Sequence, residues 1–101
     1  MTGSQKTTTK KTIKPTKDIV MSMVEDFKEK LVKIINQDIK ELVIDMKNIN
    51  NIDSSGLGVL IAAKKSLEQT GGQINLNNVP ENIESLLQVL GLDKYFNPGT
   101  M

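Results

Sequence analysis

The sequence contains no cysteine, no histidine and no tryptophan, and its only aromatic residues are Phe27, Tyr95 and Phe96. Without cysteine the chain cannot form disulfides or thiolate metal sites, and it suits a reducing compartment. Without histidine it lacks the commonest general base and metal ligand. We therefore expect an aliphatic core, no cofactor, no metal and no enzymatic activity.

Long apolar runs are also missing. No run approaches the roughly 20 residues of a membrane-spanning helix. The lysine- and threonine-rich N-terminal stretch lacks the apolar centre of a signal peptide. The 101 residues suit one domain with one modest core. We expect a soluble, cytoplasmic protein without a membrane span.

Charge is distributed unevenly along the chain. Residues 1–17 carry five lysines and no acid, whereas the remainder carries eight lysines against twelve acids. An acidic remainder does not match the phosphate backbone of nucleic acid, so we expect no direct DNA binding. We interpret residues 1–11 as a disordered basic tail, which could alternatively touch an acidic surface.

A folded domain is predicted over residues 12–97, followed by a C-terminal tail at 98–101. Residues 12–14 could form a short edge strand that Pro15 ends, because proline cannot donate to a ladder. Apolar residues then recur at steps of three and four from Asp18, which predicts an amphipathic helix of about 17 residues. Thr16 or Asp18 would cap it, and the methionines at 21 and 23 would fill the core.

The remaining pattern alternates strands with helices. Residues 41–46 form an apolar run, and a helical pattern begins near Ser55 and stops at a pair of glycines, 71–72. Residues 73–77 alternate polar with apolar, as a strand does. A third helix follows Pro80 and ends at Gly91, and residues 92–96 close the core. The order predicts a small α/β domain, with helices packed on a mainly parallel or mixed sheet.

The chain is organised around the turn at residues 51–58, where a strand leads into a helix. Ser54 and Ser55 lie where hydroxyls accept hydrogen bonds from the free amides of a first helical turn. The same amides, with the helix dipole, would also stabilise a phosphate carried by a serine. The stretch is therefore either a well-capped helix start or a phosphoacceptor site.

Four stretches together resemble the STAS domain, and more narrowly the bacterial anti-sigma factor antagonists. They are the strand Leu-Val-Ile-Asp-Met, the turn Asp-Ser-Ser-Gly-Leu-Gly, the double glycine, and the final Gly-Leu-Asp-Lys-Tyr-Phe, at residues 42–46, 53–58, 71–72 and 91–96. The match runs from about Asp18 to Phe96. Within it, the Asp-Ser-Ser-Gly turn corresponds to the family's phosphorylation site.

The resemblance implies a partner-switching function. In these antagonists the serine directly after the aspartate, here Ser54, is phosphorylated by a partner that is both serine kinase and anti-sigma factor. The unphosphorylated antagonist binds that kinase and releases a sigma factor. Phosphorylation breaks the complex, and a serine phosphatase restores it. Ser55 is the second choice for the phosphoacceptor, with capping its favoured role.

The other residues of the turn have two interpretations each. Asp53 either positions the Ser54 hydroxyl and contacts the partner, or caps backbone amides. Gly56 and Gly58 either let a partner approach closely or serve a tight strand–helix junction. Leu57 is either buried or an interface anchor. The resemblance places all six residues, 53–58, in the partner contact.

The chain departs from the family at its start. Family members begin with a hairpin of two strands, whereas this chain offers only residues 12–17 there, with Pro15 among them. The hairpin is either lost or built on a diverged strand from the polar N-terminal stretch. An alternative function is a STAS scaffold or binding module that regulates a signalling or transport complex instead of a sigma factor.

Overall fold

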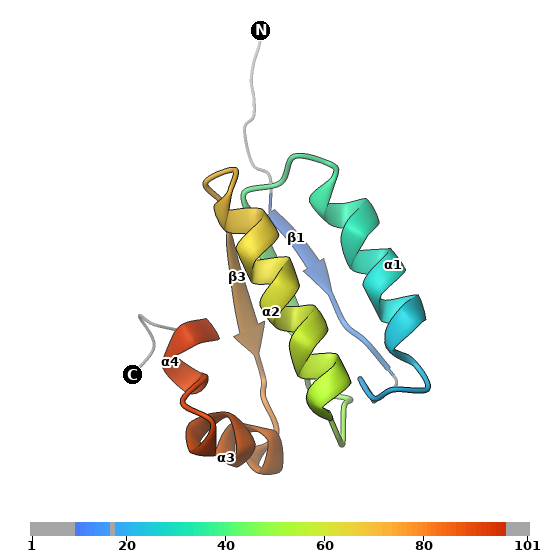
Figure 1. Ribbon diagram of the computed structural model, residues 1–101, viewed down its shortest axis with the longest axis vertical. Coiled ribbons are helices and arrows are strands. Elements are labelled where there is room, and N and C mark those ends of the chain that lie inside the picture. The colour runs from blue at the N-terminus through green and yellow to red at the C-terminus, as the bar shows by residue number, and fades with distance from the viewer. Residues whose placement is uncertain (1–9, 17, 97–101) are drawn as a thin grey trace, which may run out of the picture.

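The computed structural model describes residues 10–16 and 18–96 (Figure 1). Strands and helices alternate along most of the chain, as the sequence predicts. The elements are β1 (Lys10–Ile13), α1 (Val24–Ile35), β2 (Glu41–Asp45), α2 (Ser54–Glu68), β3 (Gln73–Asn77), α3 (Glu81–Val89) and α4 (Asp93–Phe96).

The three strands form one parallel sheet in the order β1-β2-β3. The connections from β1 to β2 and from β2 to β3 therefore run in the same direction across the sheet. Because such connections are right-handed, they place α1 and α2 on the same face of the sheet (Figure 1). The sheet has no point at which the strand order reverses. The crevice in which doubly wound sheets bind nucleotides is consequently missing from the described chain.

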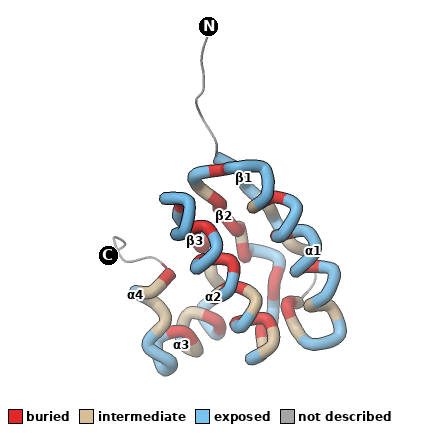
Figure 2. The backbone as a smooth tube through the Cα atoms, turned by 45° about the horizontal axis from the view of Figure 1, so that its top comes forward, coloured by how far each residue is buried: buried red, intermediate tan, exposed pale blue. Residues whose placement is uncertain are grey.

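The core is aliphatic, as expected, and lies between the sheet and its helices. The most deeply buried side chains come from β2 and the residue after it, from α2 and from the closing helix. Six of them have no exposed surface: Leu42, Ile44, Met46, Leu60, Leu67 and Phe96. The inner sides of α2, β2 and β3 form a continuous buried band (Figure 2). The small α/β fold predicted from the sequence is confirmed.

The first strand begins earlier than predicted. It starts at Lys10 and pairs along its length with β2, Lys10 opposite Glu41. The prediction that the whole of residues 1–11 is a disordered tail is therefore wrong for Lys10 and Lys11. The parts of the predicted tails at residues 1–9 and 98–101 lie outside the described residues, as does any earlier hairpin strand.

The first helix begins later than predicted. It starts at Val24 after Met23, not at Asp18. Ile19 instead forms a parallel bridge with Ile52 and is almost completely buried, which holds the chain extended there. Met21 is 72% exposed, so the expectation that it fills the core is wrong.

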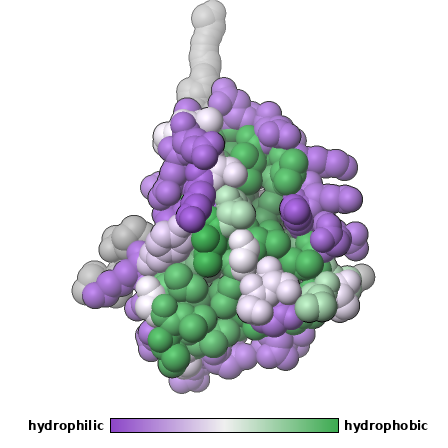
Figure 3. Space-filling view, viewed as in Figure 1, coloured by the Kyte–Doolittle hydropathy of each residue, from purple (hydrophilic) through white to green (hydrophobic). Residues whose placement is uncertain are grey.

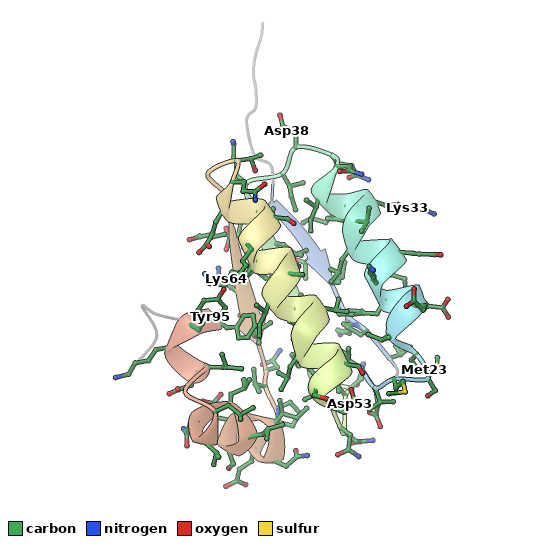
Figure 4. The ribbon with its side chains drawn as sticks, viewed as in Figure 1. Met23, Lys33, Asp38, Asp53, Lys64 and Tyr95 are labelled. Carbon is green, nitrogen blue, oxygen red and sulfur yellow. The ribbon has the colours of Figure 1, made fainter. Side chains whose placement is uncertain are left out.

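The predicted closing segment forms α4. Phe96 is buried against the core, and the Tyr95 ring meets it edge-on with the ring centroids 5.3 Å apart. The Nζ atom of Lys64 on α2 lies 4.9 Å from the centroid of the Tyr95 ring (Figure 4). Lys64 also forms an ion pair with Glu68 at 2.8 Å. A cation above an aromatic face is attracted to it, so this contact ties α4 to α2.

Candidate functional site

The turn before α2 is held by the segment that precedes α1. The Ile19 amide donates to the Asn51 carbonyl oxygen at 3.2 Å, and the Asp53 amide donates to the Ile19 carbonyl oxygen at 3.3 Å. The side chains of Ile19 and Ile52 are buried at the same bridge. Residues far apart in the sequence therefore form a short extra pair of extended segments at the carboxyl edge of the sheet.

A carboxylate adds to this support. The Oδ1 atom of Asp18 accepts hydrogen bonds from the Asn50 amide at 2.8 Å and from the Asn51 amide at 3.1 Å. Sequence reasoning made Asp18 a possible cap of the first helix. Its actual role is to satisfy two amides of the loop that leads to α2, a role with no local sequence signal because the partners lie more than thirty residues away.

Asp53 is the N-cap of α2 and uses both carboxylate oxygens (Figure 4). Oδ1 accepts from the Gly56 amide and Oδ2 accepts from the Met21 amide, each at 3.0 Å. These hydrogen bonds, that from Gly56 first and that from Met21 second, lower the pKa of the Asp53 carboxyl. Asp53 therefore stays ionised and joins the helix start to the segment before α1.

The two serines occupy the first turn of α2. Ser54 is exposed, and its hydroxyl makes no hydrogen bond to any described residue. Ser55 is half-buried. The expectation that Ser55 caps the helix is wrong, because Asp53 is the N-cap and its side chain satisfies the amide that a cap serves.

The rest of the turn divides into buried and exposed positions. Gly56 is buried, and a Cβ atom there would overlap the Ile19 carbonyl oxygen and lie 2.7 Å from the Ile19 Cγ2 atom. Gly56 thus serves a tight internal junction. Leu57 is also buried. Gly58 is exposed, with nothing within 4 Å of a Cβ atom built on it. Of the six expected contact residues, only Ser54 and Gly58 are exposed.

Asp45, at the end of β2, is a structural acceptor rather than part of this turn. Its Oδ1 atom accepts from the Asn78 side chain at 3.1 Å and from the Lys47 amide at 3.0 Å. Those hydrogen bonds, the Asn78 contact first, lower the pKa of the Asp45 carboxyl. These contacts account for the residue structurally.

The arrangement offers an accessible hydroxyl, that of Ser54. Across residues 10–16 and 18–96, no three acidic side chains converge as metal ligands would. No helix in the same part of the chain has the length and hydrophobicity needed to cross a bilayer.

Comparison with known proteins gives one family. The model of the STAS domain matches residues 4–100. The chain is 35% identical over 65 residues to the anti-sigma-B factor antagonist of Bacillus subtilis, which covers 64% of this chain and 59% of the relative. It is 36% identical over 55 residues to the anti-sigma F factor antagonist of Paenibacillus polymyxa, covering 54% and 47%. The chain thus spans about half to three-fifths of the length of these relatives.

Solved structures agree with the fold. The unphosphorylated anti-sigma factor antagonist SpoIIAA superposes with a TM-score of 0.75 at 22% identity, over 87% of this chain and 78% of that one. A candidate anti-sigma factor antagonist from Thermotoga maritima gives 0.78 at 25% identity, over 82% and 72%. The family model spans nearly the whole chain and the fold matches, so this protein belongs to the STAS domain family.

Proposed function

We propose that the chain is an anti-sigma factor antagonist whose partner binding is switched by phosphorylation of Ser54. The observation that carries this proposal is the exposed hydroxyl of Ser54, which bonds to none of the residues that the structure describes. It lies next to the Asp53 carboxylate, which the helix start and a distant segment both hold in place. The names of the two bacterial relatives support the same role.

The partner in this proposal is an anti-sigma factor that is also a serine kinase. The Ser54 oxygen attacks the γ-phosphorus of ATP, the bond from that phosphorus to the ADP oxygen breaks, and a base of the kinase takes the hydroxyl proton. The absence of histidine from the sequence fits a chain that supplies the acceptor and leaves the base to its partner. A serine phosphatase reverses the modification by hydrolysis.

Local charge explains how the switch works without unfolding. A phosphate adds roughly −1.5 to −2 charges at neutral pH. On Ser54 it lies at the positive end of the α2 dipole, which stabilises it within the domain. It also lies beside the ionised Asp53, so a partner surface that accepted a neutral hydroxyl next to one carboxylate now meets two anionic groups. The complex separates because of this charge and bulk.

The burial of Gly56 and Leu57 limits the residues of the turn that a partner can contact. Ser54 and Gly58 are exposed one helical turn apart, and Ser55 is half-exposed between them. Gly56 and Leu57 act from the interior by fixing the backbone of this turn. In our proposal the partner therefore contacts Ser54, Ser55 and Gly58 directly, together with the accessible side of Asp53.

Phosphate mapping tests the assignment. The chain, Ser54→Ala and Ser55→Ala are each incubated with the cognate kinase and ATP, and the modified residue is located by mass spectrometry. We expect phosphate on Ser54 in the unaltered chain and in Ser55→Ala, and none in Ser54→Ala. Phosphate on another residue would refute the site, and Ser55→Ala serves as the matched control.

A second candidate function is a STAS module that regulates a complex other than a sigma factor. The fold of murine Slc26a9, an anion transporter, contains a similar unit with a TM-score of 0.73, over 85% of this chain and 14% of that one. At 20% identity this likeness concerns the fold alone. Failure of the chain to bind any anti-sigma kinase, with Ser54 unmodified in cells, would favour this second function.

A further inference from the structure

The sheet has an unpaired edge at β1, on the side that α1 covers (Figure 1). β1 pairs with β2 from Lys10 to Ile13 and with no other strand of the described chain. In a parallel strand alternate residues direct their backbone groups to opposite sides, so half of the N–H and C=O groups of β1 face away from β2. Such an edge is a template on which an extended chain can pair.

The exposed side chains at this edge are basic. Lys10, Lys11 and Lys14 are all exposed, and no acid precedes Asp18 in the sequence. The only ion pair among the described residues lies on α2, so no described carboxylate comes within 4 Å of these three lysines. The edge therefore carries positive charge that contacts within the described chain leave uncompensated.

Glu41 is the acid directly opposite Lys10 in the sheet, yet it is held elsewhere. Its Oε2 atom accepts a hydrogen bond from the side-chain amide of Asn75 on β3 at 2.7 Å. The carboxylate is thereby turned to the far side of β2 and remains available to β3 instead of β1.

Two further acids lie near the end of the strand. The pKa of Asp45 is lowered chiefly by its hydrogen bond from Asn78 and only in small part by the charge of Lys14. Asp26 of α1 lines a hollow that begins at Pro15, where β1 has already ended. These acids reduce the positive potential beyond the strand, so the charge of the edge is concentrated at its start.

The far end of the same edge is more apolar. Ile13 is half-buried beside a hollow of about 50 Å³. The residues that line this hollow are Ile13, Lys14, Pro15, Phe27 and Lys30. A strand added to an edge places its side chains directly opposite those of its neighbour. The edge of β1 thus fits carboxylates opposite Lys10 and Lys11 and a small apolar side chain opposite Ile13.

We propose that the outer edge of β1 binds an extended acidic segment of another protein, which joins the three described strands as a fourth. Hydrophilic side chains line the outer side of α1, which borders this edge, and they suit a charged partner (Figure 3). A second copy of the chain is disfavoured, because it would bring two sets of lysines together along one short edge. Nucleic acid and lipid headgroups are also anionic, but they cannot satisfy strand N–H and C=O groups in register.

A synthetic peptide tests the proposal on the full chain. The probe is the capped peptide Val-Thr-Glu-Glu-Thr-Val, which has the same order in both directions and so suits parallel or antiparallel pairing. We expect its titration to shift the backbone amide resonances of β1 and to slow hydrogen exchange at two alternate amides of that strand. Binding should weaken as salt is added. The same peptide with lysine in place of glutamate should not bind.

Two N-methylated peptides separate strand pairing from plain charge attraction. Each carries methyl groups on one set of alternate amides, so one blocks the side that faces β1 and the other blocks the opposite side, while both keep the two carboxylates. One of them should bind at least about tenfold more weakly than the other. Equal affinities of the two methylated peptides and the parent would mean that no strand forms, which would overturn the proposal.

A charge reversal on the protein tests the same contact from the other side. Lys11→Glu should weaken peptide binding about fivefold or more, because an attraction across the strands becomes a repulsion. Its neighbour in the sheet is Leu42, so the new carboxylate meets no acid within the sheet register. Lys65→Glu on α2 is the matched control, since it reverses another exposed lysine and changes the net charge equally. It should leave the affinity unchanged.

Other outcomes count against the acidic strand. No binding at millimolar peptide refutes it, as do amide shifts that avoid β1. Dimerisation of the peptide-free chain through β1, seen by sedimentation and by the same amide shifts, would assign the edge to a second copy. Binding of single-stranded DNA or of phosphatidylserine vesicles at β1, without binding of the peptide, would assign the lysines to those ligands. None of these measurements involves Ser54, so the proposed function is tested separately.

Discussion

Gly56 packs its Cα hydrogen against the carbonyl group of Ile19, so closely that the residue has no room for a side chain. We expect Gly56→Ala to lower the free energy of unfolding by about 1–3 kcal/mol or more, because a methyl group must displace backbone. Urea unfolding followed by circular dichroism measures the change.

Gly58 gives the matched control two residues further along α2. A methyl group there meets nothing within 4 Å, and alanine is the better helix former by about 0.8–1 kcal/mol. Gly58→Ala should therefore raise stability slightly. Equal effects of the two substitutions would mean that the Gly56–Ile19 approach is looser than described.

Asp53 predicts an acid-sensitive helix start. Its folded pKa is lowered by the hydrogen bonds from the Gly56 and Met21 amides. The stability it contributes is present above the unfolded pKa of about 3.8 and is lost as the pH falls from there through the folded pKa. In a plot of unfolding free energy against pH, Asp53→Asn should therefore reduce the loss of stability at low pH.

Asp45 makes a comparison possible, since the pKa of its carboxyl is lowered too, chiefly by the Asn78 contact. Asp45→Asn should also reduce part of the loss of stability at low pH. It should leave the hydrogen bond from the Met21 amide to Asp53 intact. Hydrogen exchange of the Met21 amide should therefore accelerate in Asp53→Asn alone. Acceleration in both variants would contradict a direct Asp53–Met21 link.

The proposed switch predicts opposite effects of two substitutions at Ser54. Ser54→Ala should bind the anti-sigma kinase about as well as the unaltered chain and continue to bind in the presence of ATP. Ser54→Asp should weaken binding at least about tenfold, or 1.4 kcal/mol, because it adds an anion beside Asp53. Calorimetry with the purified kinase measures both affinities. Tight binding of Ser54→Asp would argue against a charge-based switch.

Phe96 predicts that the short closing helix contributes strongly to stability. Its side chain has no exposed surface, and Phe→Ala substitutions in cores cost about 3–5 kcal/mol. Phe96→Ala should therefore lower the midpoint of urea unfolding substantially. Val89→Ala, at a site 82% exposed, should change stability by less than about 0.5 kcal/mol. A small effect of Phe96→Ala would mean that α4 detaches easily from α2.

Local patterns predicted those elements whose determinants are local. The glycines after α2 and α3 end these helices as expected, with Gly71 and Gly91 at φ values of 80° and 73°. The segment before α1 could not be predicted in this way. Ile19, Val20, Met23 and Val24 fit a helical period, but the backbone of Ile19 pairs with Asn51 and Asp53, far along the chain.

The same distinction between local and distant determinants applies to the candidate site. The sequence alone predicted the turn, and the family resemblance adds the prediction, still a proposal, that Ser54 is its phosphorylated residue. It left the role of Asp53 open, because one of the two amides that the carboxylate binds belongs to Met21, 32 residues earlier. It also left Leu57 open, since a leucine in the first turn of a helix can face either way until the packing of α2 is known.

The parallel sheet has a consequence for how the protein is made. Lys10 pairs with Glu41 and Glu41 pairs with Gln73, so each neighbour lies roughly thirty residues away, and no two of the described strands meet through a hairpin. Pairings this distant close large loops before they gain contacts, which slows folding. On the ribosome β1 must remain unpaired until α1 and β2 have emerged. The turn that bears Ser54 acquires its support from Ile19 only after Asn51 and Asp53 have been synthesised. Because β2 precedes them in the chain, β2 has already emerged when this turn forms.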